Sequence, residues 1–161
     1  MNNYPKSRHY WWLNVIPKED EAYGNGWTLS ERPVGERECY SLYRDSPHCD
    51  SENKRRKRRI FRNFLEAAVG DIVIAYATDS HKRIEAILKV VAEQDGENLY
   101  FEKTELLKVP ITLAELRNRP EVSHMRYFKS RRGFRIPQGS LYKLSLLEYA
   151  AVMDLIREKN P

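Results

Sequence analysis

The sequence is poor in cysteine and contains no long apolar run. Its 161 residues include two cysteines, Cys39 and Cys49. A disulfide framework needs more cysteines than this, and a structural zinc site needs four Cys or His ligands in closely spaced pairs. A membrane-spanning helix needs roughly 18 or more consecutive apolar residues, and no run approaches that length. We therefore expect no disulfide scaffold, no metal site and no membrane span.

The beginning of the chain also lacks the features of a secretion signal. Residues 1–8 are polar and contain no apolar segment of the kind that a signal peptide carries. Apolar residues make up 41% of the sequence and charged residues 32%, a balance that suits a folded domain. A chain of this length can bury its own core. We expect a single domain over residues 1–161, located in the cytoplasm.

The motifs of several enzyme classes are missing. The sequence has no Gly-x-x-x-x-Gly-Lys-Ser/Thr loop, no His-Glu-x-x-His, no Gly-x-Ser-x-Gly, and no deaminase pair of His-x-Glu with Pro-Cys-x-x-Cys. Asp45 with Glu52-Asn53-Lys54 resembles the acid and Glu-x-Lys set of metal-dependent nucleases. These residues fall in a hydrophilic loop, however, and not on adjoining strands. The sequence thus predicts a protein without catalytic activity and without a cofactor.

Positive charge is concentrated in two short segments. Residues 54–62 contain seven Lys and Arg, and residues 126–135 contain five together with Tyr127, Phe128 and Phe134. Such clusters are typical of surfaces that bind phosphates, although a solvated helix face or a localisation signal is the alternative. The residues that we predict to contact a nucleic-acid backbone are Lys54, Arg55, Arg56, Lys57, Arg58, Arg59, Arg62, Arg131, Arg132 and Arg135.

The N-terminal half of the sequence predicts two strands and a helix. Residues 9–16 are aromatic and β-branched, and residues 38–43 alternate, as strands do. Between them, residues 18–37 form a long irregular connection, a kind of segment that is often functional. An apolar stripe at helical spacing predicts a helix from about residue 54 to residue 68, which Gly70 ends.

The C-terminal half predicts a meander of strands followed by two helices. The three strands are expected at residues 72–77, 83–92 and 99–107. Capping boxes at Thr112–Glu115 and Ser145–Glu148 begin the helices, and Leu144 and Tyr149 occupy the hydrophobic-staple positions of the second. Residues 125–139 are expected to form an exposed loop. This order predicts an α+β fold, a small mixed β-barrel with helices packed outside.

Several segments resemble the EVE-domain family. Residues 10–18 are similar to its Tyr-Trp-rich first strand, which ends in proline, and residues 57–65 and 69–76 resemble its helix and Gly-Asp-entered strand. Residues 137–144 resemble a signature of the branch fused to McrB-type modification-dependent restriction GTPases. The chain departs from this branch by extra residues at 45–53 and by a segment at 130–136 that resembles an insertion. EVE domains are similar in fold to PUA and YTH domains, mixed β-barrels that take a modified base into an aromatic pocket.

The resemblance implies a non-catalytic domain that recognises a modified, for example methylated, base in nucleic acid, with DNA favoured over RNA. It also allows for a GTPase or nuclease partner of a restriction system on another chain. A base must be flipped out of a duplex to enter such a pocket, at a cost of a few kcal/mol that phosphate contacts offset. The pocket residues that we predict are Trp12, Asn14, Trp27, Tyr40 and Ser41.

Aromatic faces in this set would reward the apolar area that a methyl group adds to a base. Tyr40-Ser41 corresponds to the Trp-Ser pair that YTH-like proteins place in their pocket, with Tyr in place of Trp. Trp27 is the large aromatic residue of the irregular connection, and a lid packed on the core is its alternative role.

The first strand carries the other pocket candidates. Trp11 and Trp12 must point to opposite sides of it, so that one packs in the core and Trp12 faces the pocket with Asn14. The Asn14 amide can read a base edge, or it can bond to backbone at the end of the strand. Tyr76, in an apolar run, is predicted to be a core residue.

Two other classes of function stay open on the sequence alone. The basic segments could bind unmodified nucleic acid or a structured RNA while the aromatic residues only pack. Alternatively, the arginines could meet the acidic groups of a protein partner. A preference for modified oligonucleotides would indicate a reader, and salt-dependent affinity alone would indicate a plain nucleic-acid binder.

Overall fold

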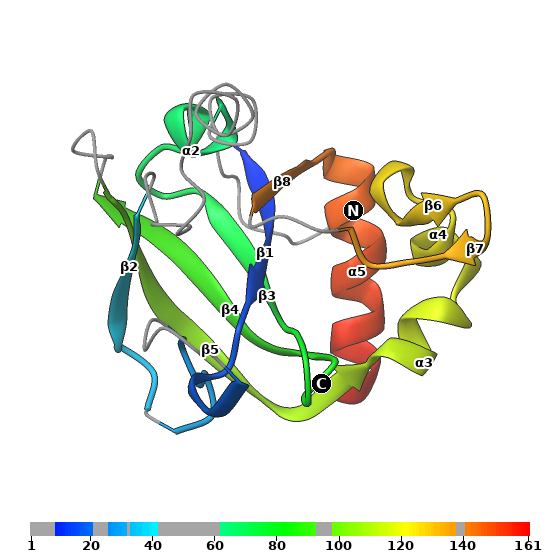
Figure 1. Ribbon diagram of the computed structural model, residues 1–161, viewed down its shortest axis with the longest axis horizontal. Coiled ribbons are helices and arrows are strands. Elements are labelled where there is room, and N and C mark those ends of the chain that lie inside the picture. The colour runs from blue at the N-terminus through cyan, green and yellow to red at the C-terminus, as the bar shows by residue number, and fades with distance from the viewer. Residues whose placement is uncertain (1–8, 21–25, 32, 42–61, 93–97, 138–140) are drawn as a thin grey trace.

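The computed structural model describes residues 9–20, 26–31, 33–41, 62–92, 98–137 and 141–161, with only the backbone of Tyr40, Ser41 and Asn98. A six-stranded mixed sheet forms its centre (Figure 1). Its strands are β1 (Tyr10–Val15), β2 (Arg37–Ser41), β3 (Ile72–Ala77), β4 (Arg83–Ala92), β5 (Asn98–Thr112) and β8 (Leu141–Leu144). The strand order is β2-β5-β4-β3-β1-β8. Strands β1 and β3 are parallel, and all other neighbours are antiparallel. The predicted α+β class with a mixed sheet is confirmed.

Both faces of the central strands are buried, so the molecule has two cores. Side chains of a strand alternate between faces, and in β1 this places Trp11, Leu13 and Val15 in the first core. The opposite face carries Trp12 into the second core, together with Tyr76 of β3. The long apolar run of β3 is explained by this arrangement, because a strand covered on both faces needs no polar side.

Helices cover the second core. The largest is α5 (Leu146–Lys159), whose predicted capping box is confirmed: Glu148 N donates to Ser145 Oγ at 3.1 Å, and Ser145 N donates to Glu148 Oε1 at 2.9 Å. The short helices α3 (Leu113–Arg117) and α4 (Pro120–Ser123) lie on the same side of the sheet (Figure 1). Among the described helices none is long and apolar enough to cross a membrane.

On the other side lies α2 (Arg62–Glu66), which is the described part of the helix predicted at residues 54–68. The start of that prediction falls outside the described residues. Its end agrees with the structure, because Gly70 follows with φ +92°, a conformation that favours glycine. Phe64 of α2 is buried in the first core.

The strands differ from the prediction in two places. Strand β5 continues to Thr112, past the predicted end at residue 107. Pro110 is tolerated because β2 pairs with β5 only over residues 98–102, so that farther along β5 is an edge strand. Strand β8 was not predicted as a strand. It is four residues long, and its pairing with β1 comes from a distant part of the chain.

The irregular connection begins with the 3-10 turn η1 (Lys18–Asp20), which is tied to the β3–β4 turn through His81. His81 Nδ1 lies 2.5 Å from Glu85 Oε1, and His81 Nε2 lies 2.5 Å from Glu19 Oε1. Glu85 is buried and also contacts Arg83, at 3.3 Å. The structure thus holds an imidazole between two carboxylates, an arrangement that favours the protonated ring.

We expect this contact to make stability depend on pH near neutrality. Burial lowers the pKa of His81, but the hydrogen bonds and charges of Glu85 and Glu19 raise it by more, so the net pKa lies above 6.5. A raised pKa contributes stability that is fully present below pH 6.5 and lost as the pH rises through the folded-state pKa. His81→Gln should remove this component, which thermal unfolding from pH 5.5 to 8.5 would measure. Identical slopes of Tm against pH in both proteins would contradict the prediction.

Candidate nucleic-acid interface

Residues 126–137 form a basic arm on the outer side of the second core. After the 3-10 turn η2 (Arg126–Phe128), strands β6 (Lys129–Ser130) and β7 (Gly133–Phe134) pair as a hairpin with Arg131 and Arg132 at its turn. Gly133 has φ +102°, and Ser130 Oγ donates to Gly133 O at 2.8 Å while accepting from Arg132 N at 3.2 Å. The prediction of an exposed loop at residues 125–139 is therefore corrected at residues 129–134, which form an ordered hairpin, while residues 138 and 139 lie outside the described part of the chain.

Aromatic side chains attach the basic arm to the core. Phe128 is buried, with its ring centroid 4.9 Å from Trp12 and 5.5 Å from Phe134. Arg135 N donates to Phe128 O at 2.9 Å, and the Arg117 guanidinium lies 6.0 Å from the Phe134 ring. Phe128 and Phe134 thus face inward. The cations of the arm that are exposed to solvent are Arg126, Lys129, Arg131, Arg132 and Arg135.

A cavity of about 320 Å³ lies at the base of the hairpin. This arm pocket is lined by Tyr127, Lys129, Ser130, Arg135 and Pro137. The half-buried Tyr127 ring lies 5.1 Å from that of Tyr142 on β8, and the Arg126 guanidinium lies 5.7 Å from Tyr127. Burial, and then the neighbouring Tyr127, raise the pKa of Tyr142, so its hydroxyl stays protonated at neutral pH. The volume is at the lower end of the range for small-molecule sites, roughly 300–1,000 Å³.

Asn14 lies directly behind the arm pocket. Its Oδ1 accepts a hydrogen bond from Trp12 Nε1 at 2.8 Å, and its Nδ2 donates to Pro137 O at 2.9 Å. The amide therefore connects β1 to the wall of the pocket. Bonding to backbone was the alternative role predicted for Asn14. In this position the residue fixes where the pocket wall lies.

Trp12 lies deeper than predicted. It is fully buried, stacked 5.4 Å from Tyr76 and in edge contact with Phe128. The expectation that only one of Trp11 and Trp12 packs in the core is corrected, because helices and loops cover both faces of β1 and both indoles are buried. The predicted core position of Tyr76 is confirmed, and burial raises its pKa to about 12.

The structure does not bring Trp27 to Trp12 and Asn14. Trp27 is buried in the first core, on the opposite face of β1, and its Nε1 donates to Glu36 Oε1 at 2.6 Å. Gly26 lets the chain pass close to β1, because a Cβ there would lie 2.7 Å from Ile16 O. The side chains of Tyr40 and Ser41 lie outside the described residues. Their strand, β2, is separated from β1 in the sheet order by β5, β4 and β3.

Of the predicted backbone-contacting residues, the structure describes Arg62, Arg131, Arg132 and Arg135, all exposed. Residues 54–59 lie outside the described part of the chain. The sequence prediction did not name Tyr127, Lys129 and Tyr142 as site residues. The alternation of aromatic and basic residues over 126–135 was the available signal for the first two. No pattern in the sequence around Tyr142 indicated that it belongs to the site.

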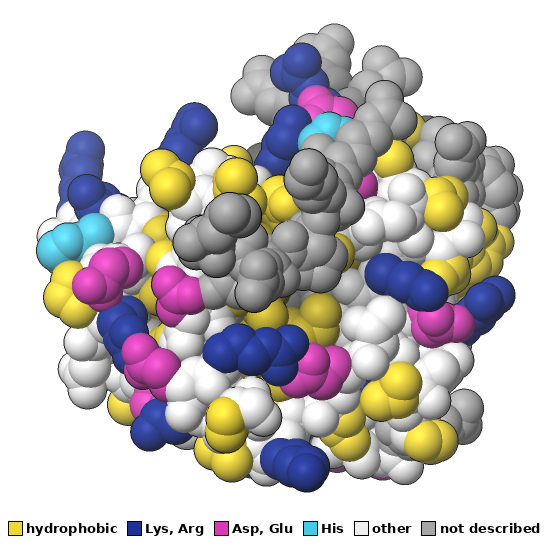
Figure 2. Space-filling view, turned by 180° about the vertical axis from the view of Figure 1, so that it is seen from behind, with side chains coloured by type: hydrophobic (Ala, Val, Ile, Leu, Met, Phe, Trp, Pro, Cys, Tyr) yellow, Lys and Arg dark blue, Asp and Glu magenta, His cyan; other side chains and the backbone are white. Residues whose placement is uncertain are grey.

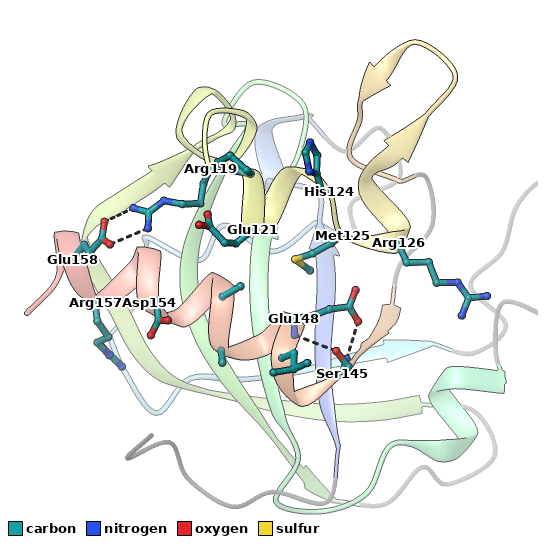
Figure 3. Close-up of a pocket in the computed structure, with 14 residues that line it drawn as sticks. Arg119, Glu121, His124, Met125, Arg126, Ser145, Glu148, Asp154, Arg157 and Glu158 are labelled. Carbon is teal, nitrogen blue, oxygen red and sulfur yellow. Dashed lines mark hydrogen bonds and ion pairs between the residues drawn. The ribbon is translucent and has the colours of Figure 1, made fainter. Parts of the chain in front are cut away.

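A larger open groove, about 1300 Å³, runs between α4 and α5 (Figure 3). Its charges are mixed. Glu121, Glu148 and Asp154 line it, and at one end Arg119 is held by both carboxylate oxygens of Glu158. The hydrogen bond from Arg119 lowers the pKa of Glu158 and keeps it ionised. Carboxylates along the groove would repel phosphates, so we do not assign nucleic acid to it.

The face of the molecule that is turned away from the viewer in Figure 1 also carries charges of both signs. In Figure 2, Lys and Arg side chains lie next to Asp and Glu at several places on this face. Among the described residues, the basic arm is therefore the segment in which positive charge and aromatic surface occur together.

Comparison with known proteins gives the fold. No family model and no curated protein matches the sequence. Human THYN1, solved in complex with DNA that contains 5-methylcytosine, is similar with a TM-score of 0.65 at 15% identity, over 95% of this chain and 99% of that chain.

Other solved structures show the same arrangement. The DUF55 domain of human thymocyte nuclear protein 1 is similar with a TM-score of 0.64 at 15% identity, over 91% of this chain and 98% of that one. Rpa0253 from Rhodopseudomonas palustris has a TM-score of 0.61 at 15% identity, over 93% and 94%. The chain therefore has the fold of the human DUF55 domain.

Proposed function

We propose that this chain is a non-catalytic domain that binds DNA and recognises a modified base. The observation that carries the proposal is the arm pocket, where the Tyr127 ring lies among exposed cations and the buried amide of Asn14 holds Pro137 in the pocket wall from behind. The fold supports it, because a solved structure with the same fold, human THYN1, contains DNA with 5-methylcytosine.

The cations would supply affinity without sequence preference. Lys129 and Arg135 line the pocket, and Arg131 and Arg132 extend beyond it. Phosphate contacts of this kind release counterions and position the backbone, whereas recognition of a base needs contacts to its faces and edges. A base flipped from the duplex would thus be held at the pocket while its flanking phosphates meet the arm.

The pocket surface suits a base with added apolar area. Tyr127 offers a face for stacking, and Pro137 offers apolar surface beside it. A methyl group on the base would contact these surfaces and be removed from water, which is favourable by about 0.8 kcal/mol per buried carbon. The resemblance to the restriction branch extends the proposal to a specificity module whose GTPase or nuclease partner is a separate chain.

A single substitution in the pocket tests the proposal. Tyr127→Ala should reduce affinity for a duplex containing one 5-methylcytosine about tenfold or more, because stacking on an aromatic ring contributes about 1–3 kcal/mol per base. Binding to the unmodified duplex, which rests on phosphates, should change little. Tyr127→Phe keeps the ring and is the matched control. Fluorescence anisotropy at fixed salt measures the affinity of wild type and both variants for each duplex.

The wild-type protein also decides between this proposal and plain nucleic-acid binding. A panel of duplexes with 5-methylcytosine, N6-methyladenine or no modification should show preference for one modification. Equal affinity for all of them, with a steep dependence on salt, would support the second candidate, a nucleic-acid binder that uses the basic arm without reading the base.

A further inference from the structure

We propose that the β6–β7 hairpin makes the domain selective for double-stranded DNA, by placing Arg131 and Arg132 in a groove of the duplex beside the bound base. The inference rests on the proposed function and adds the form of the nucleic acid.

The arginines of the turn differ from most of the arginines that the structure describes outside the arm. Outside the arm, four arginines contact a carboxylate at 3.3 Å or less, namely Arg37, Arg83, Arg119 and Arg157. Within the described part of the chain, Arg131 and Arg132 have no such ion pair and are exposed. Their charge is thus available to an anionic partner. Two adjacent unpaired guanidinium groups suit phosphates or guanine edges, both of which arginine can bind with two hydrogen bonds.

The hairpin is also held in one shape before any ligand binds. Ser130 Oγ bonds to both sides of the turn, at 2.8 and 3.2 Å, and Gly133 supplies the positive φ that the turn requires. At the base of the hairpin, Phe128 and Phe134 pack against each other and on the second core. An ordered element loses little conformational entropy on binding, so its contacts contribute more fully to affinity.

The two-stranded form of the hairpin favours binding to a duplex. The major groove of B-form DNA, about 12 Å wide, admits a two-stranded β-ribbon, whereas that of A-form RNA is too narrow for side chains to read. A single strand has no groove, so the turn would then reach one backbone at most. The arm pocket shares Lys129 and Ser130 with the hairpin. A base held in the pocket therefore places its flanking duplex next to the turn.

The test compares two double variants that each remove two exposed positive charges. Arg131→Gln/Arg132→Gln changes the hairpin turn, and Lys82→Gln/Lys108→Gln is the control, since both lysines are exposed and lie outside the arm. Each protein is titrated with one sequence as duplex DNA, single-stranded DNA and duplex RNA, with and without the preferred modification, at several salt concentrations.

For the hairpin variant we expect the slope of log affinity against log salt to fall by about 1.8 on duplex DNA, which is 0.9 for each of two lost phosphate contacts. On single-stranded DNA and duplex RNA the slope should hardly change, and the control should retain the wild-type slope on all three. Equal losses on duplex and single strand, or equal losses in the control, would overturn the inference.

The same titrations keep the two proposals apart. If wild type shows no preference for a modified base, the proposed function fails, whatever the hairpin does. If that preference persists in the hairpin variant while duplex selectivity is unchanged, the reader stands and the groove contact fails. Tm is measured for each variant, and we expect it to stay at the wild-type value because all four side chains are exposed.

Discussion

Asp71→Ala is expected to lower the free energy of unfolding by about 3–5 kcal/mol. Asp71 is fully buried and accepts hydrogen bonds from three residues in two parts of the chain. The Asp71 carboxylate accepts hydrogen bonds from His9 N at 3.0 Å, His9 Nδ1 at 3.1 Å, Trp11 Nε1 at 2.9 Å and Ala68 N at 2.8 Å. Alanine would leave several of these donors without a partner, and each buried unsatisfied group costs about 1–3 kcal/mol.

Urea unfolding followed by tryptophan fluorescence would measure this loss. Asp79→Asn is the control: Asp79 is exposed in the turn at the other end of β3, and asparagine tolerates its positive φ of 55°. The control should stay within about 0.5 kcal/mol of wild type. A loss below about 1 kcal/mol in Asp71→Ala would mean that water satisfies the donors, and the carboxylate would then not be what fixes the start of β1 to the end of α2.

Elements whose signals lie within their own residues could be predicted. Strands β3 and β4 run over the predicted residues 72–77 and 83–92, because apolar runs bounded by turns mark them. The start of α5 was equally clear, since Ser145 and Glu148 satisfy each other's backbone groups over four residues. The prediction that Trp11 and Trp12 point to opposite faces of β1 is also confirmed. That both sides of β1 would be covered could not be deduced, because the cover comes from distant segments.

The candidate site depends on contacts between residues far apart in sequence, which spacing does not reveal. Asn14 bonds to Pro137 across 123 positions, and Tyr127 meets Tyr142 only because β8 pairs with β1. The hairpin was predicted as a loop since each of its strands has two residues, too few for a periodic pattern. The composition of residues 126–135 predicted that they bind phosphates, but the arm pocket could be identified only from the folded structure.

Trp27→Ala is expected to destabilise the protein by about 3–5 kcal/mol while leaving base preference intact. The indole is 2% exposed in the first core, and Glu36, to which it donates, also contacts the buried Lys103 at 3.3 Å. Removing the ring would open a cavity beside a buried ion pair. The arm pocket lies on the other face of β1, so the ratio of affinities for modified and unmodified duplex should be unchanged in the folded protein.

Trp27→Phe separates this role from that of a cage residue. It keeps an aromatic face and loses the N–H, so we expect a smaller loss of about 1–3 kcal/mol and an unchanged ratio of affinities. Thermal unfolding and anisotropy on the same preparation measure both quantities. If the ratio instead falls tenfold in Trp27→Ala and recovers in Trp27→Phe, a flipped base stacks on Trp27. The base would then enter beside Trp27, and the basic arm would contact only the backbone.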